Sequence, residues 1–394
     1  MTNVYSLTPR PGGGESASAP SGLSSIEEIL AEMRSGRIVV ILDDEDRENE
    51  GDLIMAAECV TPESVAFMIR HTSGILCVPM EAERLARLDL PQMVPNNDDA
   101  FRTAFTVSVD YRFGTTTGVS SSDRAATIRA LADPNTLPKD FARPGHIFPL
   151  RPRKGGVLVR AGHTEAAVDL CSLAGLQPVG VLCEVMNDDG TMARRPQLEA
   201  FARQHGLKIG TIADLIRHRL RTERSVDRVA ERTVQTEFGE FRLHVYEDRV
   251  HHGVHFALAH GNLDGPTPPL VRVHVADTMR DLLGIRGDLK AWTLRAALER
   301  IAHAGSGALV VLRNPESADE MADSLRATGS PPQAPAAASG PAGDHGQVLR
   351  TYGLGAQILK DMGVRRMRVL SAPKQMHGIS AFDLEVEGYV SEDS

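Results

Sequence analysis

Residues 38–55 read IVVILDDEDRENEGDLIM, two apolar runs that enclose an acidic loop. The first run, 38–42, is typical of a buried strand, and the second begins at Leu53, so the loop is short and held at both ends. Seven of the ten residues 43–52 are carboxylates, and like charges this close repel one another. Either the loop is fully solvated, or it holds a hard divalent cation or moves protons. A calcium-binding EF-hand is excluded, because counting from Asp44 puts Asn49 where that loop needs glycine.

Helix and strand patterns alternate on both sides of this stretch. Ser25 and Glu28 can form a capping box before an apolar helical face. Together the patterns predict an α/β (α+β) domain with a mixed sheet over residues 23–222. Strands are predicted at 38–42, 75–80, 103–110, 155–159 and 179–185, and helices at 123–132, 164–174, 196–205 and 212–220.

A second α/β pattern covers residues 229–394. We place the boundary in the charged stretch 221–230, which lacks large side chains. Residues 1–22 read as a disordered tail, and residues 329–346 as a low-complexity insert in the second domain. Strands are predicted here at 238–246, 254–261, 270–276 and 308–313, and helices at 293–305 and 352–363.

Composition excludes several classes of protein. The net charge of −9 over 394 residues argues against a nucleic-acid-binding protein. Only four cysteines occur, all before residue 184. They are too few for a disulfide scaffold, and their spacing matches no regular zinc site. No apolar run reaches about 18 residues, and the start of the sequence has no apolar signal region, so we expect a cytoplasmic protein without a membrane span.

Three further stretches carry candidate functional groups. Arg160-Ala161-Gly162-His163-Thr164 opens a predicted helix, where free N–H groups and an arginine favour an anion; the alternative is a helix capped by Thr164 with an exposed histidine. The hydroxyl-rich loop 114–123 also leads into a helix. His146, in a predicted turn before a strand, is either catalytic or merely solvated. Glu184 lies in an apolar strand, so it is either at an exposed strand end or functional with a raised pKa.

Together these stretches resemble 3,4-dihydroxy-2-butanone 4-phosphate synthase. The resemblance rests on DDEDRENEGD, HTSGILC, TAFTVSVD, TTTGVSSSDRAATI, RPGHIFPLR, RAGHTEAAVDL and LCEVMNDDGTMAR, and covers about residues 24–220. It implies that D-ribulose 5-phosphate is converted to 3,4-dihydroxy-2-butanone 4-phosphate and formate in riboflavin biosynthesis. It also implies a divalent cation, Mg²⁺ or Mn²⁺, and a homodimer with the site near the subunit interface.

The resemblance assigns a role to each matching residue. Glu48 and His163 resemble metal ligands, and His146 and Glu184 resemble residues essential for catalysis, with Glu50 a further acid–base candidate. Substrate contacts are implied for Arg47, Glu48, Asp52, and the run Arg160, Ala161, Gly162, His163 and Thr164. A threonine of the run 115–117, Thr117 among them, is expected to reach the neighbouring subunit's substrate phosphate.

The second half resembles GTP cyclohydrolase II, but the catalytic parts of that family are missing. The likeness rests on FGEFRLHVY, VRVHV, AALERIAHAGSGALVVLR and RTYGLGAQILKDMGVRRMRVL. That family binds zinc through three cysteines, and no cysteine follows Cys183, so we expect no zinc. Residues 314–317 stand where that family has its nucleotide loop. Val348 stands where the family has an acidic residue, and residues 372–374 stand where it has another motif.

We therefore expect a synthase with an inactive cyclohydrolase-like second domain. The alternatives are a regulatory, nucleotide-binding or interaction module, and a bifunctional enzyme with residual GTP cyclohydrolase activity. A further alternative, a wholly non-catalytic paralogue, conflicts with the complete residue set of the first half. His251, His252 and His255 flank a predicted hairpin turn, and we favour an exposed strand and turn over a metal site there.

Overall fold

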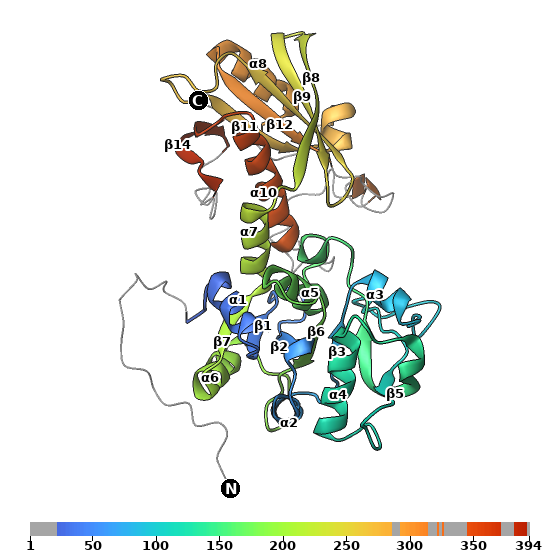
Figure 1. Cartoon of the computed structure of the whole chain (residues 1–394). Coiled ribbons are helices and arrows are strands. Elements are labelled where there is room, and N and C mark those ends of the chain that lie inside the picture. Colours follow the sequence, from blue (N-terminus) through green and yellow to red (C-terminus); the bar gives the residue numbers. More distant parts are fainter. Residues whose placement is uncertain are drawn as a thin grey trace. The chain divides into compact units, whose positions relative to one another are not determined.

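The computed structural model describes residues 22–285, 292–313, 321–322, 325–326, 345–371 and 382–391. The predicted tail at 1–22 and the low-complexity insert at 329–346 lie almost wholly outside these residues. The chain divides into two compact units, Met1–Leu215 and Ile216–Ser394, so the division falls within helix α7 (Ile212–Thr222). Each unit is built on a mixed sheet with helices, which confirms the predicted fold class (Figure 1). No helix among the described residues is long and apolar enough to cross a membrane.

The sheet of the first unit has the strand order β4-β5-β3-β6-β2-β1-β7. The acidic loop joins β1 to β2, which pair antiparallel, and β1 also pairs parallel with β7. The adjacent strands β2 and β6 are antiparallel and bring Asp52 directly opposite Glu184. The strands are β1 (Val39–Leu42), β2 (Gly51–Ala56), β3 (Cys77–Pro79), β4 (Val109–Tyr111), β5 (Phe141–Leu150), β6 (Gly180–Glu184) and β7 (Lys208–Thr211).

Helices cover both faces of this sheet. Alternation along β1 puts Val40 and Leu42 into one core, where they pack with apolar residues of α2, α4 and α6. Ile41 faces the opposite way, towards α1 and α5. The capping box predicted at Ser25 is present at the start of α1, whose apolar face is buried. The helices are α1 (Ile26–Arg34), α2 (Pro62–His71), α3 (Ala82–Arg87), α4 (Ser121–Ala132), α5 (His163–Leu173) and α6 (Arg195–His205), with short 3₁₀ turns at Ala57–Cys59 and Pro138–Asp140.

The strand predicted at 155–159 is wrong. These residues form a 3₁₀ turn, Gly156–Leu158, because Gly155 and Gly156 have φ values of 99° and 64° and so cannot extend. The Asp169 carboxylate accepts a hydrogen bond from the Val157 N–H at 2.8 Å and holds the turn. A side chain on Gly156 would collide with that carboxylate.

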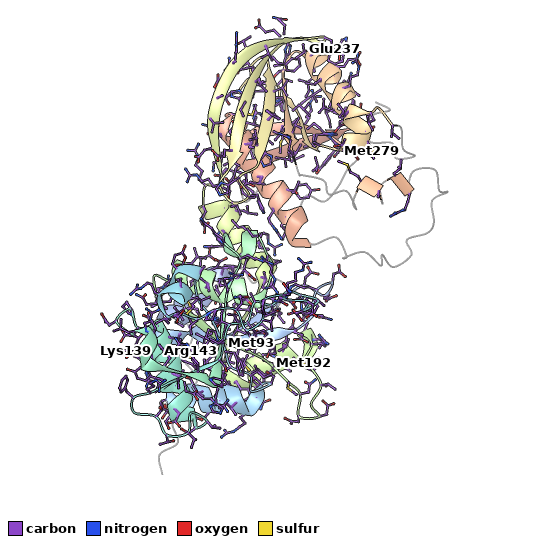
Figure 2. The ribbon with its side chains drawn as sticks, turned by 90° about the vertical axis from the view of Figure 1, so that its right-hand side faces the viewer. Met93, Lys139, Arg143, Met192, Glu237 and Met279 are labelled. Atoms are coloured by element: carbon purple, nitrogen blue, oxygen red, sulfur yellow. The ribbon has the colours of Figure 1, made fainter. Side chains whose placement is uncertain are left out.

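Two other strand boundaries also differ from prediction. The turn expected before residue 147 lies inside β5, as a bulge, since Ala142 pairs with Asp110 whereas Ile147 pairs with Val109. Arg143, which Figure 2 labels in the first unit, donates a hydrogen bond to the Leu88 carbonyl at 2.7 Å. Of the strand predicted at 103–110, only the end is regular, because residues before Val109 make isolated bridges instead.

The second unit has the strand order β14-β13-β11-β12-β10-β9-β8. Helix α10 packs on one face and α8 on the other. Gly363, with a φ of 86°, lies in the turn that follows α10, as predicted. The elements are β8 (Val226–Thr236), β9 (Gly239–Asp248), β10 (Val254–His260), β11 (Leu270–Val275), α8 (Leu294–Ala304), β12 (Gly307–Leu312), α10 (His345–Asp361), β13 (Arg366–Leu370) and β14 (Glu385–Val390).

Strand β8 was not predicted. It occupies much of the charged stretch in which we place the domain boundary, and it pairs antiparallel with β9 along its whole length. Because β8 is the edge of its sheet, most of its side chains are exposed, and buried apolar residues do not alternate with polar ones along it. The period-2 signal that marks an inner strand is therefore missing from its sequence.

Candidate active site

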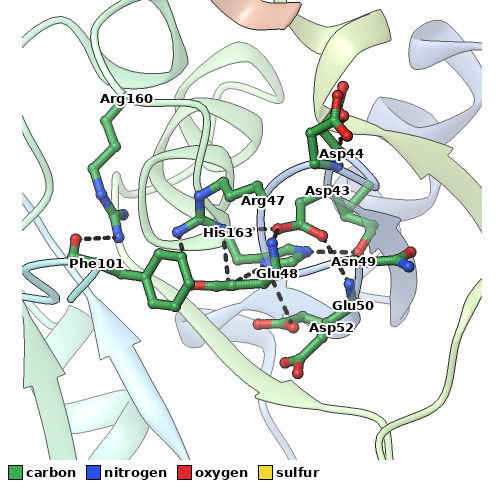
Figure 3. Close-up of polar contacts among 12 residues, drawn as sticks. Asp43, Asp44, Arg47, Glu48, Asn49, Glu50, Asp52, Phe101, Arg160 and His163 are labelled. Carbon is green, nitrogen blue, oxygen red and sulfur yellow. Dashed lines mark hydrogen bonds and ion pairs between the residues drawn. The ribbon is translucent and has the colours of Figure 1, made fainter. Parts of the chain in front are cut away.

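The acidic loop is folded around the carboxylate of Asp43. This side chain is fully buried. One of its oxygens accepts a hydrogen bond from the Glu50 N–H at 2.8 Å, and the other from the Glu48 N–H at 3.2 Å and the Arg47 guanidinium at 2.8 Å. Arg47 also forms two parallel bonds to Glu48, at 2.8 and 2.9 Å. The Arg47 guanidinium and two backbone N–H groups thus offset part of the repulsion, so the loop is not simply a solvated turn (Figure 3).

His163 faces this loop from the first turn of α5 and is buried. Its Nε2 lies 3.0 Å from the Ile41 carbonyl oxygen, which can only accept, so Nε2 carries the hydrogen. The free lone pair is therefore on Nδ1, 3.9 Å from the nearer Glu48 oxygen and 3.5 Å from Asp52. Burial lowers the pKa of His163, which keeps the ring neutral and able to ligate a metal.

Asp43, Glu48 and His163 form a group able to hold a metal ion. Their ligand atoms all lie within 4.8 Å of one another. Oxygen atoms with one imidazole nitrogen suit a hard or borderline divalent cation. Glu48 and His163 were predicted from the sequence, and Asp43 was missed as a member of this group.

Asp52 and Glu184 lie beside this group, opposite each other on β2 and β6. Burial, and then the Glu184 and Glu48 carboxylates, raise the pKa of Asp52 well above its usual range. Burial and the Glu48 carboxylate also raise the pKa of Glu50. Glu184 is half-buried, and the Ser73 hydroxyl donates a hydrogen bond to it at 2.6 Å. Ser73 lies in the HTSGILC motif, but no role was predicted for it from the sequence.

The start of α5 is open. The alternative interpretation of this stretch, a helix capped by Thr164, is therefore wrong. Gly162 is the N-cap and offers no side-chain hydrogen bond, while Thr164 is buried within the first turn. Free first-turn N–H groups remain, as an anion site needs. Arg160 lies beside them, bonded to Glu165 at 2.7 Å and to the Phe101 carbonyl at 3.2 Å. A side chain on Gly162 would meet the Arg160 guanidinium and force it to shift.

A second polar group lies on β4, β5 and the loop before α4. His146 Nδ1 is 2.7 Å from one Asp110 oxygen, and the other oxygen accepts a hydrogen bond from the His146 N–H at 2.9 Å. The carboxylate fixes the hydrogen on Nδ1 and leaves the lone pair on Nε2. Gly118 packs against both side chains, and Thr117 next to it is exposed. In the described part of the chain, no hydrogen bond or ion pair joins this group to the metal-ligating group.

Comparison with known proteins identifies the first unit. Residues 27–218 match the family model for 3,4-dihydroxy-2-butanone 4-phosphate synthase. A protein of that name from Pseudomonas aeruginosa is 50% identical over 93% of this chain and 99% of its own length. The chain belongs to the 3,4-dihydroxy-2-butanone 4-phosphate synthase family. It is an enzyme of riboflavin biosynthesis.

Relatives of the synthase share the two-unit organisation. Residues 227–391 match the family model for GTP cyclohydrolase II. A crystal structure titled as a two-domain 3,4-dihydroxy-2-butanone 4-phosphate synthase from A. baumannii is 40% identical, with a TM-score of 0.78 over 94% of this chain and all of that one. A synthase crystallised with two magnesium ions is 50% identical and covers 51% of this chain, with a TM-score of 0.50. A relative from Oryza sativa subsp. japonica named as probably bifunctional is 47% identical over 95% of this chain and 70% of its own length.

The second unit of the synthase holds a cavity lined by both apolar and charged side chains, and this unit contains no cysteine. The cavity, of about 320 Å³, lies among β11, the turn after it and α10, and its lining includes Arg272, Arg280 and Tyr352. In the turn, Asp281 accepts hydrogen bonds from His274 Nε2 at 2.7 Å and from the Asp277 N–H at 2.9 Å. The predicted changes at 314–317 and 372–374 lie outside the described residues.

The histidines of the β9–β10 hairpin differ from prediction in one respect. His255 is buried rather than exposed. Its Nδ1 accepts a hydrogen bond from the Arg313 N–H at 3.1 Å, so Nε2 carries the hydrogen and has no lone pair for a metal. His251 bonds to Asp248 at 2.8 Å. This pattern argues against a cation at these histidines.

Proposed function

We propose that the first unit converts D-ribulose 5-phosphate to 3,4-dihydroxy-2-butanone 4-phosphate and formate, using Mg²⁺ or Mn²⁺ held by Glu48 and His163. The observation that carries the metal assignment is the tautomer of His163. Its lone pair on Nδ1 points to the side on which Glu48 and Asp52 lie, while its other nitrogen is occupied by a carbonyl. The magnesium ions named for a synthase 50% identical to this chain support the choice of metal.

The residues around the metal group supply binding and proton transfer. A bound divalent cation would stabilise the enediolate that forms when a proton is removed next to the substrate ketone. Glu50, Asp52 and Glu184 are placed to move protons during dehydration, rearrangement and loss of formate. Arg47, Arg160 and the open N–H groups of residues 161–164 are placed to hold the phosphate and sugar oxygens. The substrate's atoms divide between the two products, so no co-substrate is needed.

We further propose that the synthase is a homodimer. Phe113 and Val119 are exposed by 59% and 45%, and they flank the threonine run 115–117. Exposed apolar side chains around a functional loop favour a protein partner. A second copy covering them would bring Thr117 close to the neighbour's substrate phosphate. Light scattering is expected to give twice the mass of the chain, and a monomer at micromolar concentration would contradict the proposal.

We also propose that the second unit is inactive as a GTP cyclohydrolase and binds no zinc. The support is chemical, because the chain has no cysteine after Cys183, and a catalytic zinc site of that family cannot form without thiolates. The second candidate is a regulatory or nucleotide-binding module. It is favoured by the cavity beside Arg272 and Arg280, whose guanidinium groups suit an anionic ligand.

A paired assay on the full chain tests these proposals together. One arm contains ribulose 5-phosphate and Mg²⁺, and the other GTP and Zn²⁺. We expect butanone phosphate and formate in the first arm and no pyrimidine product in the second. Since both reactions release formate, the organic product must be measured. Turnover of GTP would contradict the inactive assignment, whereas GTP binding without turnover, measured by calorimetry, would support the nucleotide-binding module.

A further inference from the structure

Glu48 lies next to a residue with a left-handed backbone conformation. Asn49 has a φ of 56°, in a region that asparagine adopts more readily than most other non-glycine residues. Contacts to the backbone on both sides of Asn49 hold the segment in place. The Asp43 carboxylate supplies one set of contacts, to the N–H groups on either side of Asn49. The carbonyl groups of this segment need a separate partner.

Arg194 is that partner. It is the N-cap residue of α6, far from the loop in sequence, and its guanidinium donates hydrogen bonds to the carbonyl oxygens of Glu48 at 2.6 Å and Asn49 at 2.5 Å. The same NH1 group makes both bonds, so the two consecutive carbonyls converge on one nitrogen. The loop is therefore held by an anion that accepts from its N–H groups and by a cation that donates to its carbonyls.

The ion pair that Arg194 makes does not explain its placement. The nearest Glu50 oxygen is 3.8 Å away, and the Arg194 side chain is 43% exposed. Exposed pairs at this distance contribute little to stability. The two short backbone bonds are the strong contacts, and they fix the main chain rather than any titrating side chain.

We propose that Arg194 is a positioning residue for the metal site. By holding the carbonyls of Glu48 and Asn49, it presets the backbone from which the Glu48 carboxylate reaches toward His163 Nδ1. Without it, these two carbonyls lose their shared donor, and the carboxylate loses its position relative to the imidazole. This inference rests on the proposed metal ligands, and it adds a residue that touches neither the metal nor the substrate.

The test measures metal binding to the metal-free full chain, with Mn²⁺ as the probe and electron paramagnetic resonance to count free ions. R194A is expected to weaken Mn²⁺ binding roughly 10–100-fold, the usual effect of removing a residue that orients a metal ligand. R194K should recover part of the loss, because an ammonium group can still donate to both carbonyls. R195A is the matched control, since Arg195 pairs with Glu199 of the same helix and leaves the loop untouched.

E48Q, measured alongside, separates two kinds of failure. Mn²⁺ binding that is lost in E48Q but normal in R194A overturns the role of Arg194 and leaves the metal site standing. Normal binding in both variants overturns the metal assignment itself. A lower melting temperature of metal-free R194A, with a loss of affinity that R194K does not recover, assigns Arg194 to general stability and also overturns the proposal. If R194A does not fold, R194K against R195A decides the question.

Discussion

Glu48→Gln is expected to remove metal binding and with it the synthase activity, while leaving the fold intact. The glutamine keeps the shape of the side chain but replaces a charged oxygen ligand by a neutral amide. Loss of residues that only orient a ligand costs about 10–100-fold in metal affinity, so loss of a ligand should cost more than about 100-fold. Turnover at a fixed Mg²⁺ concentration should fall with it.

The stability of the metal-free E48Q variant should be unchanged or higher. Glu48 lies among Asp43, Glu50 and Asp52, and its charge helps to raise the pKa values of the last two. Removing it relieves that repulsion, at the loss of the bidentate contact from Arg47. Mn²⁺ titration and thermal melting with and without metal measure both effects. E45Q is the control in the same loop, since Glu45 is exposed; a variant E48Q that still binds Mn²⁺ tightly would refute the assignment.

The sequence predicted the acidic loop and His163 because their chemistry is carried by residue types at short spacing. Seven carboxylates between two buried strands demand an explanation whatever the fold. Glu184 was a candidate for a similar reason, as a charge in an apolar run, but its catalytic role was implied only by the family resemblance. That Asp52 and Glu184 lie directly opposite each other depends on the pairing of β2 with β6. Since these strands are far apart in the sequence, local patterns could not show this register.

The contacts that orient these residues could not be predicted from local patterns, although Ser73, Asp110 and Arg194 all lie within the motifs that carry the resemblance. Ser73 and Arg194 reach Glu184 and the acidic loop from segments more than one hundred residues away. Asp110 ended a predicted strand and looked like an ordinary boundary residue. The failure at 155–159 has a different cause, because two glycines adopt left-handed conformations that their apolar neighbours concealed. Strand β8 was missed because an edge strand does not need an apolar face.

The two units differ in the functional groups that their sheets carry. In the first, the residues of the acidic loop, Asp52 and Glu184 lie at the ends of β1, β2 and β6, and His163 faces them from α5. In the second, the sheet and its helices are intact, but an aspartate–histidine bond closes the turn after β11. Retention of a packed core without thiolates favours a scaffold kept for binding or assembly over one kept for hydrolysis.

The second large effect is expected at the pair of Asp110 and His146. His146→Ala should lower kcat about 10²–10⁴-fold, the usual contribution of a general acid–base group. Asp110→Asn should cause a similar loss, although Asp110 touches no substrate in this proposal. The amide of asparagine can donate to Nδ1 and so favour the opposite tautomer, which puts the hydrogen on Nε2 where the lone pair is needed.

The double variant decides whether these two residues act as one unit. If Asp110 works only by fixing the tautomer of His146, D110N adds nothing once His146 is gone, and the losses are not additive. Independent roles would instead multiply the two losses. Mn²⁺ binding should be normal in all three variants, because no described contact joins this pair to the metal group. D188N, a change at an exposed turn aspartate, controls for the loss of one charge. Full activity of D110N would show that His146 needs no partner to hold its proton on Nδ1.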